Sequence, residues 1–459
     1  MGQNVSVSMR RTFFMKTTNV EIHPTDQMLS IGDLFLLGLQ HIAAMCAGAM
    51  AVPMILGNSL GLGSNDIHAL VTAAFMMAGL GTLIQTLGIK KIFGSRLPMV
   101  EGVSFAGVAA LTAVGITYRG TDSLTGLQIM FGATIVSGIF CMVMAPVFGK
   151  LLKFFPPLVS GVVVTSMGLS LIPVAVRWAG GGNPASADFG SFQNIFIALI
   201  TLVIIIGIQK LSKGFLGNIA ILIGIVAGTA IAVFMGAVDF SNVKEVGFIA
   251  FNMPLKFGMP KFELTSILSL FLVQLVIMTD ATGNQLNLSN ICGTDEKDEK
   301  RLIAGLRAHG LSSMLGGIFN TFPQSLFGQN VGIAAMTGVS SRFVGTAAVV
   351  ILLLVSIFPK LTAVLTAIPL PVLGGAGIVM FGIVAANGIK RLGEVNYAGN
   401  KNLMIVAVSI GLAVVPIAVP EIFKQFPAWG KILFQSSVTL GCLSVVILNV
   451  IFNEMNKKK

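Results

Sequence analysis

Two polar side chains stand one helical turn apart within a long apolar stretch of the sequence. Asp280 and Asn284 are four residues apart, which places them on the same face of a helix. Asp280 offers a carboxylate that accepts hydrogen bonds, and Asn284 offers an amide that both donates and accepts them. A planar heterocycle with alternating N–H and C=O groups presents the complementary pattern. The pair therefore predicts a binding site for such a ring.

Two adjacent amides, Gln329 and Asn330, would add further donors and acceptors to this site. They follow a proline and a glycine that interrupt the helical pattern. The alternative for these amides is that they cap the backbone of a broken helix. Thr337 and Gly338 lie about two turns further along, where we expect them to tune selectivity, although a Thr hydroxyl at such a position often bonds only to its own helix.

The composition indicates a membrane protein. The chain has 459 residues, of which 54% are hydrophobic and 10% charged, with a mean hydropathy of +0.90. Soluble domains carry about 25% charged residues. Apolar segments near the roughly 20 residues that a spanning helix needs recur from Ile31 to Phe452. We therefore expect an all-α polytopic membrane protein rather than a barrel of short alternating strands.

Missing motifs exclude several functions. The sequence has no P-loop, no HExxH pair and no Ser/His/Asp set with elbow glycines, so it predicts no enzyme. The four cysteines form no CxxC pair, which argues against a metal centre or a disulfide framework. The net charge of +11 does not predict nucleic acid, because the basic residues lie in short loops without aromatic stacking platforms. A secondary transporter or a channel without a cofactor remains.

Fourteen apolar segments are candidate membrane spans. Their approximate ranges are 31–52, 67–87, 98–116, 127–147, 157–175, 191–208, 216–237, 264–286, 302–319, 328–340, 342–358, 369–389, 402–419 and 432–452. The third and tenth are short and interrupted by Pro and Gly, so a count of twelve also fits the hydropathy. We divide the chain into an N-terminal tail (1–28), two seven-span repeats (29–240 and 262–452) and a basic C-terminal tail (453–459).

The distribution of basic residues predicts the orientation of these spans. With the N-terminus inside, 21 of the 29 Lys and Arg residues fall on the inner side. The positive-inside rule then places both termini in the cytoplasm of a multi-pass protein of the plasma (inner) membrane.

The two halves of the chain resemble each other weakly. Residues 155–161 are similar to residues 368–375, about 210 positions later. Because seven is an odd number, a repeat of seven spans is inverted, as in many transporters. Segments 96–105 and 322–330 occupy matching places, and each combines Pro, Gly and polar residues. Such a pair of short interrupted segments is the best indication of a substrate site in a sequence.

Few titratable residues lie within the apolar segments. Of the 18 acidic residues, only Glu101 and Asp280 lie well inside them, and of the four histidines, His41 and His309 do. A carboxylate at the bilayer centre costs about 3 kcal/mol, so such a residue is a functional candidate. The alternative is a structural ion pair or a helix–helix hydrogen bond. We expect no ion pair with a basic residue, because no Lys or Arg lies deep in a predicted span.

The segment Gln329–Gly338 is similar to the signature of the nucleobase–ascorbate transporters, also called nucleobase:cation symporters of the second type. That signature reads Gln-Asn-x-Gly, four variable residues, Thr, and then Arg, Lys or Gly. Gln40-His41, residues 161–171 and residues 371–382 match further motifs in the same order. The resemblance covers roughly residues 30–450, and the bacterial xanthine and uric acid permeases resemble the chain best.

The resemblance implies seven plus seven inverted spans divided into a core and a gate domain. It also implies a homodimer in the bilayer that imports a purine base or uracil together with protons, by alternating access. Asp280 would hold the base and His41 would support affinity. The predicted substrate site comprises Asp280, Gln329, Asn330, Asn284, Glu101, Ser104, Thr337 and Gly338. The predicted proton-coupling residues are Asp280, His309, Glu101 and His41.

Several positions depart from the family pattern. Xanthine and urate members usually have Glu at the position of Asp280, and many members have Asp at that of His309. Glu101 stands where an uncharged residue is commoner. We therefore expect His309 to interact with Asp280 or Glu101 and to link protonation to substrate binding.

We rank xanthine first as substrate, uric acid second and uracil third. A uracil or pyrimidine permease of the same family is one alternative function. An anion transporter or channel that shares the fold is the other, although such proteins lack the Gln-Asn-x-Gly signature and the carboxylate of the eighth span.

Overall fold

The computed structural model describes residues 23–120, 122–151, 156–212, 215–238, 240, 243, 246–295 and 298–454. Residues 1–22 and 455–459 lie outside these ranges, and with them most of the two predicted tails.

The described chain is built from helices that follow the predicted spans. In the first half they are α1 (Ile31–Leu60), α2 (Ser64–Leu87), α3 (Val108–Tyr118), α4 (Ser123–Leu151), α5 (Pro157–Ala179), α6 (Phe192–Leu211), α7 (Phe215–Asn218) and α8 (Ala220–Phe234). In the second half they are α10 (Leu264–Ile291), α11 (Glu299–Ile318), α12 (Gly328–Thr337), α13 (Phe343–Ile357), α14 (Pro359–Thr366), α15 (Leu370–Leu392), α16 (Lys401–Ala418), α17 (Ala428–Phe434) and α18 (Ser437–Asn449). Short 3-10 turns (Pro24–Asp26, Phe105–Gly107 and Pro420–Phe423) and a π-turn (Val450–Glu454) complete the helical elements.

Within the described residues, eight helices are long and apolar enough to cross a bilayer. They are α1, α2, α4, α5, α6, α10, α15 and α16. The pair α13 and α14, bent by 84°, makes a ninth if it is counted as one span. The other predicted spans coincide with shorter apolar helices, with α11, whose first turn carries charged residues, or with α12, which has 10 residues. The expected helical membrane fold is thus present.

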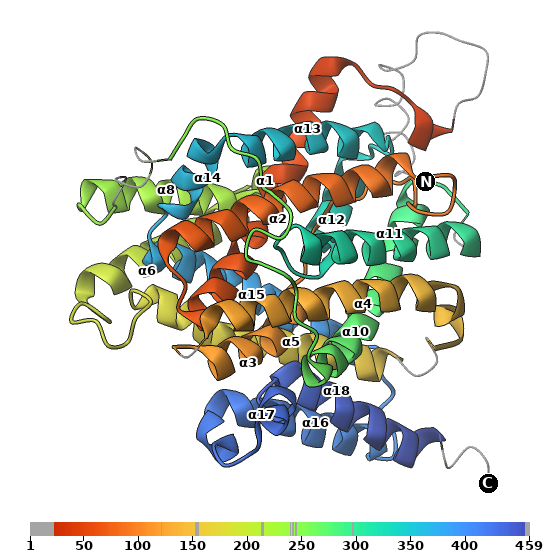
Figure 1. The fold of residues 1–459 in the computed structure, drawn as a ribbon. Helices are drawn as coiled ribbons and strands as arrows, with labels where there is room; N and C mark the ends of the chain where they lie inside the picture. The colour runs from red at the N-terminus through yellow and green to blue at the C-terminus, as the bar shows by residue number, and fades with distance from the viewer. Residues whose placement is uncertain are drawn as a thin grey trace.

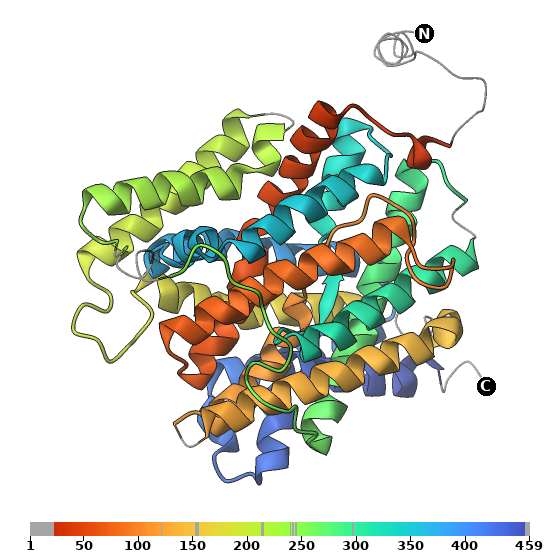
Figure 2. The ribbon, with the colours of Figure 1, turned by 45° about the horizontal axis from the view of Figure 1, so that its top comes forward.

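The helices pack in two bundles. The first contains α1–α4 and α10–α14, and its most extensive contacts pair α4 with α11 and α2 with α13. The second contains α5–α8, α15, α16 and α18, and its central pair is α5 with α15. Figure 1 shows α1 and α13 at one edge of the molecule and α16 with α18 at the opposite edge. Figure 2 shows α6 and α8 side by side at the outside of the second bundle.

Glycine allows the central pair of the second bundle to touch backbone to backbone. A Cβ added at Gly168 of α5 would stand 2.3 Å from the backbone nitrogen of Ala385 on α15. A Cβ added at Gly388 would stand equally close, at 2.3 Å, to the backbone nitrogen of Thr165. In lipid, where burial of apolar surface adds little, such close contacts hold helices together.

Two short strands, one from each half of the chain, interrupt the helical bundle. β1 (Glu101–Val103) pairs antiparallel with β2 (Gln324–Leu326), with Glu101 opposite Leu326 and Val103 opposite Gln324. β1 leads through the turn Phe105–Gly107 into α3, and β2 leads into α12. Each strand satisfies the backbone polar groups of the other, which extended backbone at membrane depth requires. The two interrupted segments expected from the sequence thus meet in space.

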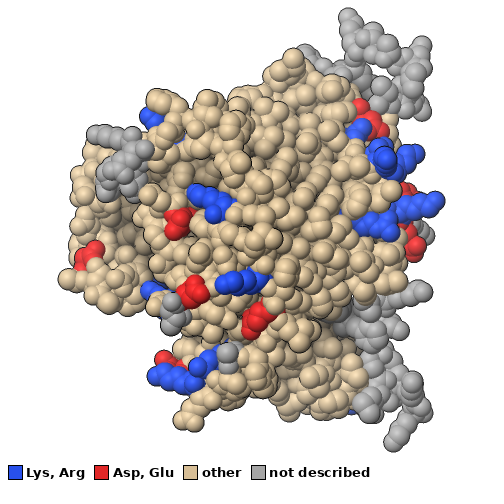
Figure 3. Space-filling view, viewed as in Figure 1, with Lys and Arg blue, Asp and Glu red and all other residues tan. Residues whose placement is uncertain are grey.

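Charged residues are sparse on the face of the molecule seen in Figure 3. Most of this face is uncharged, and Lys and Arg side chains gather at its right-hand edge. Large apolar side chains are exposed on the outer helices, among them Phe192 and Phe196 of α6 and Leu403 and Met404 of α16. An uncharged surface with exposed apolar side chains suits a lipid environment.

Candidate functional site

A cavity of about 680 Å³ lies where the strand pair meets both bundles. The first bundle lines it with residues 103–106 beside β1, with Asp280 and Asn284 of α10, and with residues 325–329 at the start of α12. The second bundle contributes Val164 and Met167 of α5 and residues near the end of α15. This volume is within the usual range for a small-molecule site.

Both oxygens of the Asp280 carboxylate are engaged. Oδ2 accepts a hydrogen bond from Nδ2 of Asn284 at 3.1 Å, as their spacing predicts. Oδ1 lies 2.5 Å from Nη2 of Arg391. The two side chains of this ion pair are partly exposed, Arg391 by 28% and Asp280 by 36%, and both line the cavity.

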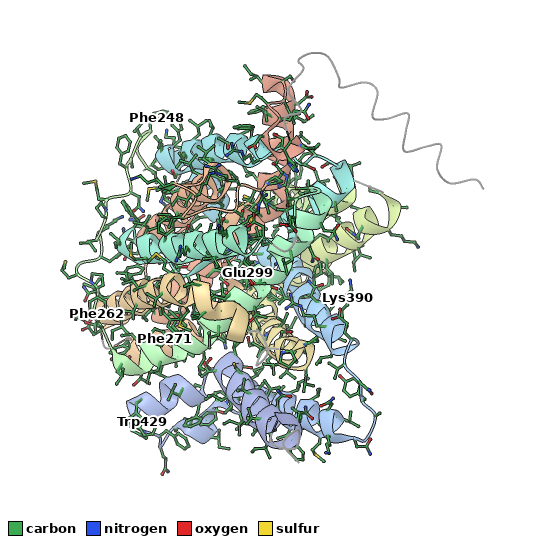
Figure 4. The ribbon with its side chains drawn as sticks, turned by 90° about the vertical axis from the view of Figure 1, so that its right-hand side faces the viewer. Phe248, Phe262, Phe271, Glu299, Lys390 and Trp429 are labelled. Carbon is green, nitrogen blue, oxygen red and sulfur yellow. The ribbon has the colours of Figure 1, made fainter. Side chains whose placement is uncertain are left out.

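The ion pair corrects the expectation that Asp280 has no basic partner. The predicted twelfth span ends at residue 389, which assigns Arg391 to a loop. In the structure α15 continues to Leu392, so Lys390 and Arg391 form its last turn and line the cavity. Figure 4 places Lys390 on the opposite side of the view from Phe248 and Phe262. Cations are favourable in the last helical turn because they complement the helix dipole.

Gln329 lies in the first turn of α12 and lines the cavity. Asn330, the next residue, is buried and does not line the cavity. A Cβ added at Gly328 would lie 3.5 Å from Oδ1 of Asn284, so the start of α12 lies beside α10. Among the described residues, no side chain caps the N-terminus of α12, and neither side-chain polar atom of Asn330 has a partner. The capping alternative for these amides is therefore absent from this structure. The backbone N–H groups in the first turn of this helix give its start a partial positive charge.

The other predicted substrate-site residues differ in their positions. Ser104 lines the cavity, and its Oγ accepts a hydrogen bond from the backbone nitrogen of Ala106 at 3.3 Å. Thr337 and Gly338 lie at the far end of α12, where Thr337 Oγ1 donates to the carbonyl of Ile333 at 2.9 Å. Neither residue lines this cavity. Their expected influence on selectivity would therefore have to act through the position of α12.

Glu101 and His309 form a second polar cluster, which the cavity does not reach. Nδ1 of His309 lies 2.6 Å from Oε1 of Glu101, and the two side chains are 1% and 0% exposed. The same carboxylate oxygen accepts a hydrogen bond from Nε2 of Gln85 at 2.8 Å. The backbone nitrogen of Glu101 donates to Oγ1 of Thr82 at 2.9 Å. Of the two expected partners of His309, the structure therefore provides Glu101.

Unused bonding capacity remains in this cluster. Within the described part of the chain, Oε2 of Glu101 and Nε2 of His309 have no hydrogen-bond partner. A buried polar atom without a partner is costly and requires an explanation, such as a functional role. His41, the other predicted coupling residue, is buried in α1, and its Nδ1 has no partner among the described residues either.

The sequence did not reveal Gln85 and Arg391. Gln85 lies inside the second predicted span, where its neutral side chain does not stand out as an acid or a histidine does. Its amide also donates to the carbonyl of Gly305 at 2.9 Å and accepts from the backbone nitrogen of Ser95 at 3.1 Å, which fixes its orientation. The signal for Arg391 was the following Gly393, because a glycine after a basic turn indicates a helix end. Asn387 and Glu394 also line the cavity and were not predicted.

Comparison with known proteins identifies the relatives of this chain. A family model described as a permease family matches residues 32–422. The chain is 40% identical to the uric acid transporter UacT of Escherichia coli over 429 residues, which cover 93% of this chain and 88% of that protein. It is also 40% identical to the xanthine permease of Bacillus subtilis over 428 residues, covering 93% of this chain and 95% of that protein.

Solved structures of other transporters share the fold. The transmembrane domain of a cyanobacterial bicarbonate transporter, BicA, has a TM-score of 0.61 at 17% identity, covering 92% of this chain and 97% of that chain. The murine anion transporter Slc26a9 in its inward-facing state has a TM-score of 0.63 at 13% identity, covering 98% and 75%. At such low identity the likeness shows the fold alone.

Proposed function

Since the chain belongs to this permease family, the nucleobase–ascorbate transporters, we propose that it carries a purine base across the membrane. Family members are permeases, so the chain is a transporter and not an enzyme. The observation that carries the proposal is the cavity in which the Asp280 carboxylate, the Asn284 amide and the Gln329 amide face one space. These groups complement the N–H and C=O edges of an oxopurine.

Within this class we favour xanthine and uric acid as substrates. Both rings present several N–H donors to a carboxylate and several carbonyls to amides and helix N–H groups. Relatives at 40% identity carry the names of these two bases. Uracil remains the alternative within the family. An inorganic anion fits less well, because it offers no ring N–H groups to the Asp280 carboxylate.

For the architecture we propose fourteen spans in two inverted repeats, with the first bundle as core and the second as gate. Corresponding contacts support the repeat. If the first seven predicted spans are exchanged with the last seven, the pair α4–α11 becomes the pair α13–α2. In the same way α1–α13 becomes α10–α4, and α6–α15 becomes α16–α5. Movement of the core against the gate would then expose the cavity alternately to the two sides.

We further propose a homodimer in the plasma membrane with both termini in the cytoplasm. The excess of basic residues on one side supports the orientation. The outer helices α6 and α16 bury little of their surface within the chain, so they are available to lipid or to a second copy.

Proton coupling is proposed for the cluster of Glu101 and His309. With one titratable proton between its two groups, such a pair would carry no net charge, either as a carboxylate beside an imidazolium or as a carboxylic acid beside an imidazole. Losing or gaining a proton leaves a net charge in a buried site, which is unfavourable unless the surroundings change. Glu101 lies in β1, and the residues directly after β1 line the cavity. Gain or loss of a proton at Glu101 and His309 can therefore alter the cavity, and with it substrate binding, through a shift of β1.

Uptake measurements test the proposed function. Cells that express the chain would be given labelled xanthine, urate, uracil or guanine, with and without a proton uncoupler. We expect concentrative uptake of xanthine or urate that the uncoupler abolishes. Concentrative uptake of uracil alone would select the alternative within the family. Purine uptake that persists with the uncoupler would exclude proton coupling.

Gln329→Ala tests the direct role of the signature. We expect this variant to reach the membrane in nearly normal amount, because the side chain is exposed and caps nothing in this structure. High-affinity uptake should be lost, because the variant removes an amide that faces the cavity. Membrane content by immunoblot and uptake kinetics provide the check. Poor accumulation of the protein in the membrane would show that Gln329 supports the fold.

A further inference from the structure

In the structure, the residue proposed to anchor the base has a charged partner. Oδ1 of Asp280 faces Arg391, and Oδ2 accepts from the Asn284 amide, so each carboxylate oxygen already has one partner. A base that donates two N–H groups to this carboxylate competes with the Arg391 guanidinium for it.

The ion pair also connects the two bundles. Asp280 is on α10 of the first bundle, whereas Arg391 is on α15 of the second. Both remain partly exposed to the cavity, where a ligand can reach them. Lys390 and Glu394 line the same cavity, but among the described residues neither forms an ion pair. These two opposite charges balance each other, so the specific change on ligand binding concerns Asp280 and Arg391.

Such competition weakens the bonds of the guanidinium to its counter-ion beside the bound ligand. A neutral ligand donates N–H groups to Asp280 but offers Arg391 no opposite charge in return. A ligand that is itself an anion, with its charge delocalised over ring nitrogens and carbonyl oxygens, supplies a new partner. The planar guanidinium fork suits such an edge, which presents acceptors in one plane. The loss of the original pair is then offset only for the anion.

We propose that Arg391 is a specificity-determining residue that favours an oxopurine bound as its anion over a neutral purine of similar shape. This inference rests on the proposed function and adds the charge state of the substrate. It makes Arg391 a direct ligand contact and not only the ion-pair partner of Asp280.

Binding measurements on the purified full-length chain test this proposal. Urate, a monoanion at neutral pH, would be compared with hypoxanthine, which is neutral, in the wild type and in Arg391→Gln. Lys390→Gln is the matched control, because it removes the same charge from the neighbouring position of the same cavity wall. We expect Arg391→Gln to weaken urate binding at least roughly tenfold more than hypoxanthine binding, the effect of one lost bond to a charged group. Lys390→Gln should leave the ratio of the two affinities nearly unchanged.

Other outcomes have distinct meanings. Equal losses for both ligands in Arg391→Gln, or equal changes of the ratio in both variants, would overturn the selective role of Arg391. A wild type that binds neither purine would overturn the proposed function and this inference with it. Arg391→Lys keeps the charge but not the planar fork, and we expect it to retain part of the preference for urate. If Arg391→Gln does not fold, an unchanged preference in Arg391→Lys contradicts recognition by the fork.

Discussion

Asp280→Asn should weaken purine binding by about 1.5–3 kcal/mol, or roughly 10- to 150-fold, because hydrogen bonds to a charged group contribute this much. Asn keeps the size of the side chain but loses the charge, and its amide presents two N–H groups where the base also presents N–H groups. The substitution also leaves Arg391 without its ion-pair partner. Binding of xanthine or urate to the purified variant measures the loss directly.

Two controls distinguish this effect from a general disturbance. Asp280→Glu keeps the carboxylate, so it should bind purines far better than Asp280→Asn. Asp298→Asn removes a carboxylate from the start of α11, outside the cavity, where Asn can replace it as the helix cap. It should bind like the wild type. If Asp280→Asn keeps its affinity and uptake, the carboxylate does not hold the base.

The sequence predicted the site best where local spacing decides the geometry. Asp280 and Asn284 share a helix face because four residues make about one turn, and the structure brings them into contact. The interrupted segments were recognisable because Pro and Gly break a helix wherever they occur. The pairing of Glu101 with Leu326 across two strands depends on a long-range contact, which the spacing within either segment does not contain.

The sequence misjudged the surroundings of Arg391, Glu101 and Asp280, because these depend on where helices end and how they pack. Arg391 was counted as a loop charge because hydropathy marks where apolar surface ends and not where a helix ends. Glu101 and Asp280 looked alike as acids within apolar segments. The first is sealed among Gln85, Thr82 and His309, and the second faces the cavity. Which buried acid contacts a ligand depends on packing between helices, so composition alone could not separate them.

The division of the two acids has a consequence for energy coupling. Asp280 lines the cavity. Glu101 instead lies with its Oε1 2.6 Å from Nδ1 of His309, in a cluster that the cavity does not reach. A transporter that binds its proton and its substrate at separate places can link them only through the element between them. Here β1 is that element, since Glu101 begins it and Val103 and Ser104 line the cavity. Linkage then requires that each ligand raise the affinity for the other by the same factor.

His309→Gln should therefore abolish concentrative uptake while leaving exchange of substrate across the membrane. Gln keeps a polar side chain in the buried site but cannot take up a proton. In the wild type, substrate should bind more tightly as the pH falls, because protonation of the pair and binding favour each other. In the variant this pH dependence should flatten, and the accumulation ratio of a neutral purine should fall to about one, the value of a carrier without a driving force.

The measurements compare pH profiles of equilibrium binding, uphill uptake and counterflow exchange in the wild type and three variants, in membranes prepared in the same way. Glu101→Gln should behave like His309→Gln, because either substitution destroys the pair that holds the proton. Ser312→Ala is the matched control, since Ser312 lies three residues from His309 on α11 and its hydroxyl has no partner among the described residues. It should accumulate substrate like the wild type. If His309→Gln retains concentrative uptake with an unaltered pH profile, His309 is a structural residue. Loss of accumulation in Glu101→Gln alone would then assign the proton to the carboxylate.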